Sequence, residues 1–302
     1  MLAMSMKQWL SLFFRILVLT VALLICVGLG AGLTGQRANP PQNGAQAGTT
    51  AILLLLVCFL ETAVMTILVL HSWWSGTKLM GAVFLVLFGV RTLMPQMESF
   101  IFLGRVISPG TVARIAAMGA VTSILFSPVA VFVLSKMRGE AGPEIYSNSS
   151  MSWAYWRIAV MVLAYLVLYF SFGYFIAWKN PAVRAYYGGT DPGSFLLQLA
   201  DTVRTTPWLL SFQILRALLW IGLGAVVIKM MDAPRWLKGL GVSLAFAVLM
   251  NAQLLIPNPY MPQPVRMIHL VETAGSNFLF GWILVWVLLP RARRVEETSA
   301  VS

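Results

Sequence analysis

The chain has 302 residues, of which 59% are hydrophobic and only 10% are charged. Several apolar stretches exceed the roughly 18 residues needed to cross the hydrocarbon core of a membrane, which excludes a soluble protein. The formal net charge of +11 does not indicate nucleic-acid binding, because the Lys and Arg residues are scattered between the apolar stretches. The composition therefore predicts an all-α, polytopic protein of the lipid bilayer.

Eight apolar stretches predict eight transmembrane helices. They cover residues 9–33, 50–72, 78–103, 112–135, 152–178, 207–231, 236–257 and 265–290. Ten Lys and Arg residues lie in the segments on the side of the termini and six in the opposite segments, so we expect both termini in the cytoplasm. Arg291, Arg293 and Arg294, which follow the last span, are the strongest anchor for this orientation.

The segment over residues 179–206 is predicted to be an extracytoplasmic loop. Its second part, 193–206, places Leu196, Leu199 and Val203 on one face of a helix. This pattern is typical of an amphipathic helix that lies in the membrane interface. An ordinary connecting helix is the alternative.

The two halves of the chain resemble each other in order and spacing. Basic residues open paired spans: Arg15 and Arg157 in spans one and five, Lys78 and Lys238 in spans three and seven, Arg114 and Arg266 in spans four and eight. We therefore expect a four-plus-four repeat with units at 1–140 and 152–290, a cytoplasmic connector at 141–151 and a cytoplasmic tail at 291–302. Units with an even number of spans insert in the same orientation, related by a pseudo-two-fold axis along the membrane normal. Chance similarity between apolar helices is the alternative.

Several charged side chains fall inside the predicted spans. A charge at the centre of the bilayer costs at least about 2.5 kcal/mol, so such a group normally faces protein or water and has a partner. Glu61, Arg91, Arg216 and Asn251 are predicted to lie at similar depth, which makes a shared polar layer possible. We expect Glu61 and Glu272 to pair with Arg91 and Arg216, in a combination that the sequence leaves open.

Glu98 lies near the predicted outer end of span three, away from this layer. There it is expected to be solvated or paired with Arg105 rather than to bind a ligand.

The eighth span has the clearest polar pattern. His269, Glu272, Thr273 and Ser276 recur at positions i, i+3, i+4 and i+7, which form one face of a helix. Such a stripe is expected to face the interior of the bundle, where His269 and Glu272 are suited to exchange a proton near neutral pH. The candidate ligand-binding residues are Glu61, Arg91, Arg216, Asn251, His269, Glu272 and Ser276. The alternative is a purely structural set of buried ion pairs that fix helix register.

No cofactor or metal site is predicted. His269 and Glu272 form a single His-x-x-Glu sequence, without the second motif of a di-iron helix bundle. His71 belongs to the opposite membrane face, and no nucleotide-binding or hydrolase fingerprint occurs. Cys26 and Cys58 lie inside apolar stretches and are expected to act as small hydrophobic residues.

Three functions remain open at this point. The first is a transporter or permease-like protein for a small anionic or lipid-like solute. The second is a membrane-embedded enzyme that acts on a lipid-linked substrate, with His269 and Glu272 as acid and base. The third is an accessory or scaffold protein with a partner membrane subunit. The expected location is the cytoplasmic membrane of a bacterium, because no external glycosylation sequon and no organelle-targeting signature is found.

Overall fold

The structure, a computed structural model, describes residues 5–36, 44–138, 151 and 153–289. These residues form helices and connecting loops and contain no β-strand. The helical elements are α1 (Met6–Thr34), α2 (Gly44–Leu70), α3 (Gly76–Phe88), η1 (Gly89–Leu93), α4 (Met94–Phe102), α5 (Pro109–Val133), α6 (Tyr155–Phe172), η2 (Gly173–Trp178), α7 (Pro181–Tyr187), α8 (Phe195–Thr205), α9 (Pro207–Met230), α10 (Arg235–Leu244), η3 (Ala245–Leu249), η4 (Ala252–Leu255) and α11 (Gln263–Leu288). The expected connector, apart from residue 151, and the expected tail with its arginine cluster lie outside the described residues.

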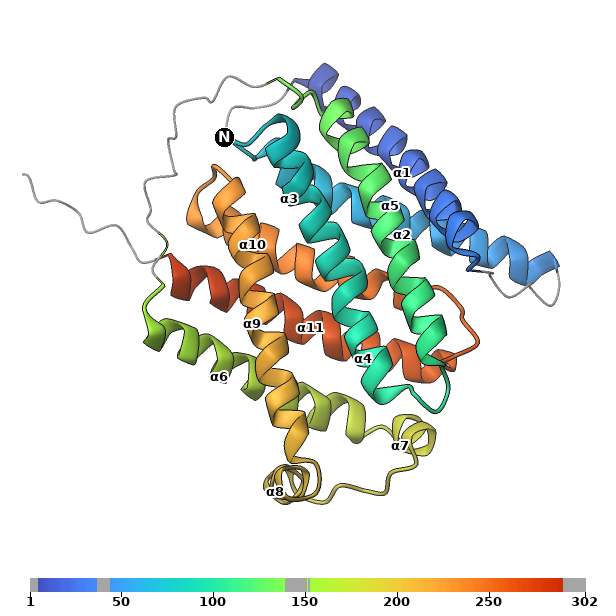
Figure 1. The fold of residues 1–302 in the computed structure, drawn as a ribbon, viewed down its shortest axis with the longest axis vertical. Helices are drawn as coiled ribbons and strands as arrows, with labels where there is room; N and C mark the ends of the chain where they lie inside the picture. Colours follow the sequence, from blue (N-terminus) through green and yellow to red (C-terminus); the bar gives the residue numbers. More distant parts are fainter. Residues whose placement is uncertain (1–4, 37–43, 139–150, 152, 290–302) are drawn as a thin grey trace, which may run out of the picture.

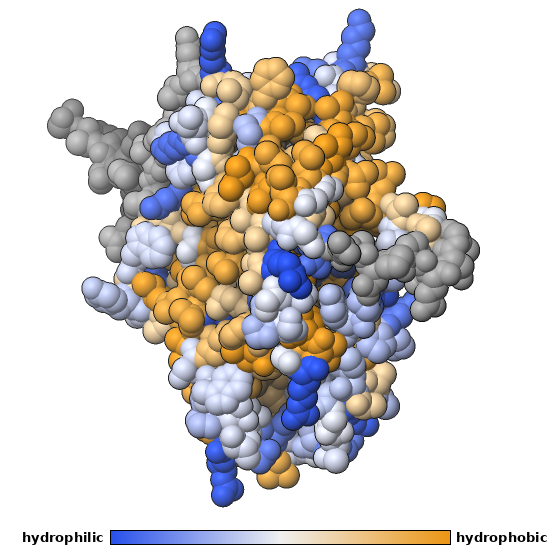
Figure 2. Space-filling view, turned by 45° about the vertical axis from the view of Figure 1, so that its right-hand side comes forward, coloured by the Kyte–Doolittle hydropathy of each residue, from blue (hydrophilic) through white to orange (hydrophobic). Residues whose placement is uncertain are grey.

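Eight of these helical segments are long and apolar enough to cross a membrane, and each coincides with one of the predicted spans. Spans three, five and seven are composite: α3, η1 and α4 form the third, α6 and η2 the fifth, and α10, η3 and η4 the seventh. Apolar side chains cover a broad part of the surface, with hydrophilic side chains toward its margins (Figure 2). The chain is therefore a multi-pass helical membrane protein.

The composite spans each contain a π-helical stretch of five or six residues, η1, η2 or η3. A π-helical stretch widens the helix and leaves backbone carbonyls that need other donors. Side-chain amides of the seventh span supply two of them. Gln253 donates to the carbonyl of Arg91 at 2.8 Å, and Asn251 donates to the carbonyl of Ala247 at 2.9 Å. The widened stretches are thus stabilised by polar side chains within the membrane-spanning region.

The same packing pattern recurs in the first four and the last four spans (Figure 1). In the first group α1 packs on α2 and α5, and α3 packs on α5. In the second group α6 packs on α9 and α11, and α10 packs on α11. The groups meet where α2 contacts η3 and η4, and where α9 contacts α3. The second and third spans of each group therefore form the interface between them.

A short backbone contact joins the two groups at one end of the bundle. Ser72, just after α2, forms an isolated antiparallel bridge with Met231, just after α9. Trp73 N donates to Met230 O at 3.0 Å, and Asp232 N donates to His71 O at 2.7 Å. The ends of the second and sixth spans are thus held together.

In both groups of spans, close contacts between helices depend on glycine. A Cβ atom on Gly30 of α1 would lie 2.7 Å from Oγ1 of Thr122 and 2.8 Å from the carbonyl oxygen of Met118, both on α5. Any larger residue would force α1 and α5 apart. In the last group, a Cβ atom on Gly281 would lie 2.8 Å from Cα of Ser243, which brings α11 close to α10.

One ion pair is fully enclosed by the bundle. Nε of Arg91, in η1, lies 2.9 Å from each carboxylate oxygen of Glu61 on α2. The side chains are 5% and 0% exposed, respectively. The pair joins spans two and three at the interface between the groups, where Gln253 of the seventh span also binds the Arg91 carbonyl. The ion pair therefore links the second and third spans beside the seventh.

Replacing one partner of this pair should destabilise the bundle strongly. Glu61→Gln leaves the Arg91 charge without a counter-charge in a dry environment, a loss of about 3–5 kcal/mol for buried pairs. Thermal unfolding of the detergent-solubilised protein measures it. The double variant Glu61→Leu/Arg91→Met removes both charges and should recover most of the loss. A double variant no more stable than Glu61→Gln would contradict the charge-pairing account.

Candidate functional site

A cavity of about 730 Å³ lies at the end of the bundle that carries α7 and α8. Its walls come from spans three, five, six and eight, with α7, α8 and the end of span seven completing the enclosure. In Figure 1, α7 and α8 lie together at this end, outside the main bundle. The volume falls within the roughly 300–1,000 Å³ of sites that hold small organic molecules.

The cavity gathers most of the residues singled out from the sequence. Five of them line it: Arg216, Asn251, His269, Glu272 and Ser276. Glu61 and Arg91 do not line it and form the buried ion pair described above. The candidate residues are thus divided between a buried ion pair and a cavity wall, and do not form a single layer of contacts.

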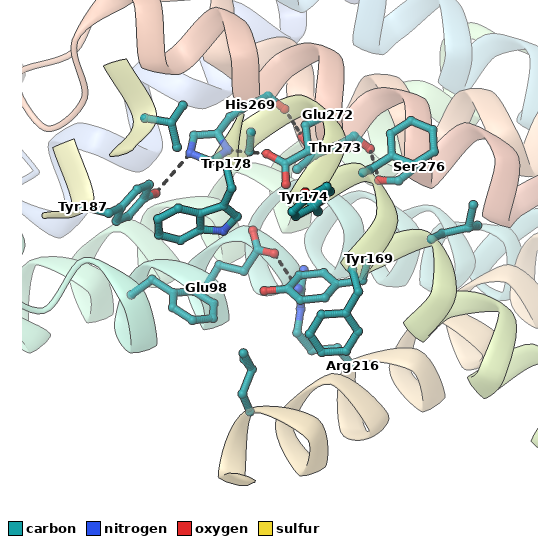
Figure 3. A pocket seen from close by; sticks show the side chains of 18 of the residues that line it. Glu98, Tyr169, Tyr174, Trp178, Tyr187, Arg216, His269, Glu272, Thr273 and Ser276 are labelled. Carbon is teal, nitrogen blue, oxygen red and sulfur yellow. Dashed lines mark hydrogen bonds and ion pairs between the residues drawn. The ribbon is translucent and has the colours of Figure 1, made fainter. Parts of the chain in front are cut away.

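A chain of hydrogen bonds runs along one side of the cavity (Figure 3). The hydroxyl of Tyr187 on α7 lies 3.2 Å from Nε2 of His269, and Nδ1 of His269 lies 2.6 Å from Oε2 of Glu272. Burial raises the pKa of the Tyr187 phenol above its usual value, so the phenol stays protonated at neutral pH and donates its hydrogen. In a neutral imidazole Nε2 then accepts, and Nδ1–H donates to Glu272.

A second charged pair lies on the other side of the cavity (Figure 3). Nη1 of Arg216, on α9, forms an ion pair with Glu98 of α4 and lies 3.2 Å from Oε1 of Gln213. The same amide oxygen accepts a hydrogen bond from Tyr165 of α6 at 3.3 Å. Spans three, five and six are thereby connected around one guanidinium.

This pairing corrects two expectations. Glu98 binds Arg216 and not Arg105, because the turns of α4 place its carboxylate inside the bundle. Glu272 binds His269 of its own helix and no arginine of the described residues.

Polar groups of spans seven and eight complete the inner wall. The Thr273 hydroxyl lies within hydrogen-bond distance of Asn251 Oδ1 and of the His269 carbonyl. Ser276 Oγ donates to the Thr273 carbonyl at 3.2 Å. The amide, the hydroxyls and the His269–Glu272 pair therefore form a continuous polar strip on α11 and its neighbour.

Aromatic side chains from η2 and the loop helices also line the cavity. Tyr174 and Trp178 come from η2, and the Tyr174 hydroxyl donates to the carbonyl of Gly193 at 2.5 Å. Phe195 at the start of α8 packs against Tyr174, with ring centroids 5.3 Å apart. These contacts hold α8 across the cavity mouth.

The helix α8 has two different faces. Leu199 lines the cavity with Phe195, whereas Leu196 and Val203 are exposed. The structure thus confirms a helix in the predicted segment, and its regular turns place Leu196, Leu199 and Val203 on one face, as expected. Leu199 lies where this face meets the cavity.

Three residues of these hydrogen-bond networks were not among the candidate site residues predicted from the sequence. Gln213 stands three positions before Arg216, so it shares the helix face of Arg216, a signal that was available. Glu98 stands seven positions after Arg91, and its apparent position near the end of a span hid its role. Tyr187 lies in a short loop helix, where the sequence has no feature that indicates a contact with span eight.

The described residues include no group of three or more His, Cys, Asp and Glu side chains arranged to hold a metal ion. The lining residues of the cavity offer a carboxylate with an imidazole, a guanidinium with a carboxylate, hydroxyls and amides. Such a set can bind a polar group and exchange a proton with it.

The hydrogen-bond chain predicts which ring nitrogen of a neutral His269 carries the proton. We expect the Nδ1-protonated form in the neutral imidazole, and a shift toward the other tautomer in Tyr187→Phe, which frees Nε2. With two histidines in the sequence, ¹⁵N spectra of histidine-labelled protein resolve both rings, and His71→Gln assigns them. A neutral ring protonated at Nε2 in the unchanged protein would contradict the arrangement.

Comparison of the chain with protein-family models, with curated proteins and with solved structures gave no match.

Proposed function

We propose that the chain is a membrane transport protein that binds a small amphipathic, lipid-like solute in the cavity. The observation that carries this proposal is the cavity itself, whose polar strip and aromatic wall enclose a space large enough for such a solute. A purely structural polar core would be filled by its own side chains, as it is around Glu61 and Arg91.

The proposed orientation has both termini in the cytoplasm, so the cavity opens toward the outside. The opposite end of the bundle is closed by close packing. A Cβ atom on Gly241 would lie 3.0 Å from Sδ of Met231 and 3.1 Å from Cδ2 of Leu68, and the Ser72–Met231 bridge lies at the same end. These features are those of a transporter in an outward-facing state.

We also propose that the two groups of four spans are a parallel repeat. The recurrence of the same helix contacts supports it, as does the antiparallel bridge between equivalent segments after α2 and α9. In proteins with such repeats the groups rock against one another to expose a shared site to alternate sides. Here the interface that would move is formed by α2, α3, α9 and the seventh span.

Alternating access can be tested by cysteine labelling, because the two native cysteines, Cys26 and Cys58, are buried. Ser276→Cys places a thiol in the cavity, and Ser243→Cys places one in the closed half, where Ser243 is 0% exposed. In vesicles of one orientation, a membrane-impermeant thiol reagent should label Ser276→Cys from the outside. It should label Ser243→Cys slowly and only from the cytoplasmic side.

Two outcomes count against transport. Labelling of Ser276→Cys without any labelling of Ser243→Cys over many hours would indicate a fixed external pocket. Labelling of both positions from the same side would show an open pore in place of alternating access. Wild-type protein treated in the same way controls for Cys26 and Cys58.

A second candidate is a membrane-embedded enzyme that acts on a lipid-linked substrate. The Tyr187–His269–Glu272 chain favours it, because an imidazole oriented by a carboxylate is a common general base. For this candidate, purified protein in vesicles of bacterial polar lipids should generate a new lipid species detectable by mass spectrometry. His269→Ala should abolish the product while the variant remains folded. An unchanged lipid profile with the wild-type protein, or continued turnover by His269→Ala, would remove this function.

A further inference from the structure

Glu272 gives the inner wall of the cavity a carboxylate that no arginine of the described residues neutralises. Arg216 is 2% exposed, and its guanidinium is bound by Glu98 and Gln213. The carboxylates face the space more openly, since the side chains of Glu98 and Glu272 are 26% and 12% exposed. Arg105 also lines the cavity, but its side chain is exposed to the surroundings at the end of span three. A solute deep in the cavity therefore meets carboxylate oxygens before it meets a guanidinium.

Arg216 offers little to an anion in this arrangement. Its Nε has no hydrogen-bond partner among the described residues, yet the atom is itself inaccessible, so a solute in the cavity cannot reach it. An anionic group would lie beside the Glu272 carboxylate, while the charges of Glu98 and Arg216 cancel in their ion pair. Like charges at such distances in a partly desolvated site are strongly unfavourable.

Aromatic rings surround these carboxylates. Tyr169, Tyr174 and Trp178 line the cavity with Glu98 and Glu272, and Figure 3 shows all five side chains in the same space. The negative face of an aromatic ring attracts a cation, most strongly where water is excluded. The chain uses this attraction itself, because Nζ of Lys179 lies 4.9 Å from the Tyr174 ring centroid.

Carboxylates combined with aromatic faces bind cations that carry apolar groups. The carboxylates supply the opposite charge, and the rings contact both the charge and its apolar substituents. A small inorganic cation would leave most of the roughly 730 Å³ and the aromatic wall without contacts. An organic cation with bulky apolar substituents satisfies both parts of the wall.

We propose that the solute bound in the cavity is a lipophilic organic cation, an ammonium or phosphonium compound with apolar substituents. This inference rests on the proposed function, because it names the solute class of the same cavity. It replaces the anionic solute expected from the arginines of the spans.

Two probes of matched shape and opposite charge test the inference directly. Tetraphenylphosphonium and tetraphenylborate have nearly the same size and apolar surface but opposite charges. The difference between their affinities therefore shows whether the cavity prefers a cation or an anion. Equilibrium dialysis with the purified full-length protein in a non-ionic detergent, corrected for micelle uptake, should show phosphonium binding at least about tenfold tighter. Quenching of tryptophan fluorescence by the bound probe provides a second readout.

Glu272→Gln is the main variant, since it removes a cavity charge and leaves the Glu98–Arg216 pair intact. It should weaken phosphonium binding by about tenfold. The ratio of the affinity for phosphonium to the affinity for borate should fall accordingly. Asp201→Asn is the matched control, because this exposed acid on α8 does not line the cavity. The control should bind both probes as the unchanged protein does. Thermal unfolding of each variant separates lost binding from lost folding.

Three results would overturn the inference: borate bound as tightly as phosphonium or more tightly, binding of neither probe, or phosphonium binding by folded Glu272→Gln equal to that of the control. None of these results concerns the exposure of Ser243→Cys to the cytoplasm, so transport would remain supported by labelling. Conversely, selective phosphonium binding in a protein whose Ser243→Cys is never labelled would retain the cation site and remove the transport function.

Discussion

A charge in the hydrocarbon core has to be paired or hydrated, and the whole arrangement of this chain follows from that requirement. Two solutions coexist within one bundle. Glu61 and Arg91 are enclosed and neutralise each other without access to solvent. Arg216 is neutralised by Glu98 at the wall of a cavity, beside the His269–Glu272 pair. The first solution fixes the position of spans two and three, and the second leaves groups that a solute can reach.

The backbone adapts to the same requirement. The π-helical stretches occur in spans three, five and seven, and they coincide with the enclosed ion pair or with the cavity wall. Arg91 belongs to η1, Tyr174 and Trp178 belong to η2, and Asn251 closely follows η3. Widened helical stretches reorient side chains relative to a regular helix and frequently occur at functional sites. The polar side chains and the local helix geometry therefore support the same position for the site.

The sequence was sufficient for the spans and for the stripe on the eighth span. Both depend on local spacing: apolar length determines a span, and the i, i+3, i+4, i+7 pattern places His269, Glu272, Thr273 and Ser276 on one face. The ion-pair partner of each buried charge could not be derived from the sequence, because it depends on which helices are neighbours and on the rotation of each helix about its axis. Predicted depth favoured Glu61 over Glu98 as the partner of Arg216, whereas the structure pairs Arg216 with Glu98. Tyr187 approaches His269 only because the loop helix α7 folds back over span eight, a contact between residues 82 positions apart.

The close approach of α1 and α5 at Gly30 has a consequence for how such a sequence can diverge. Positions in this contact are limited by volume, since even one methyl group would collide with Thr122 and Met118. Positions around the cavity are limited by chemistry, since a substitution there changes what is bound before it changes how the helices fit. Mutational drift should therefore leave the small residues of the first four spans in place. New solute preferences would then arise through exchanges on α4, η2 and α11.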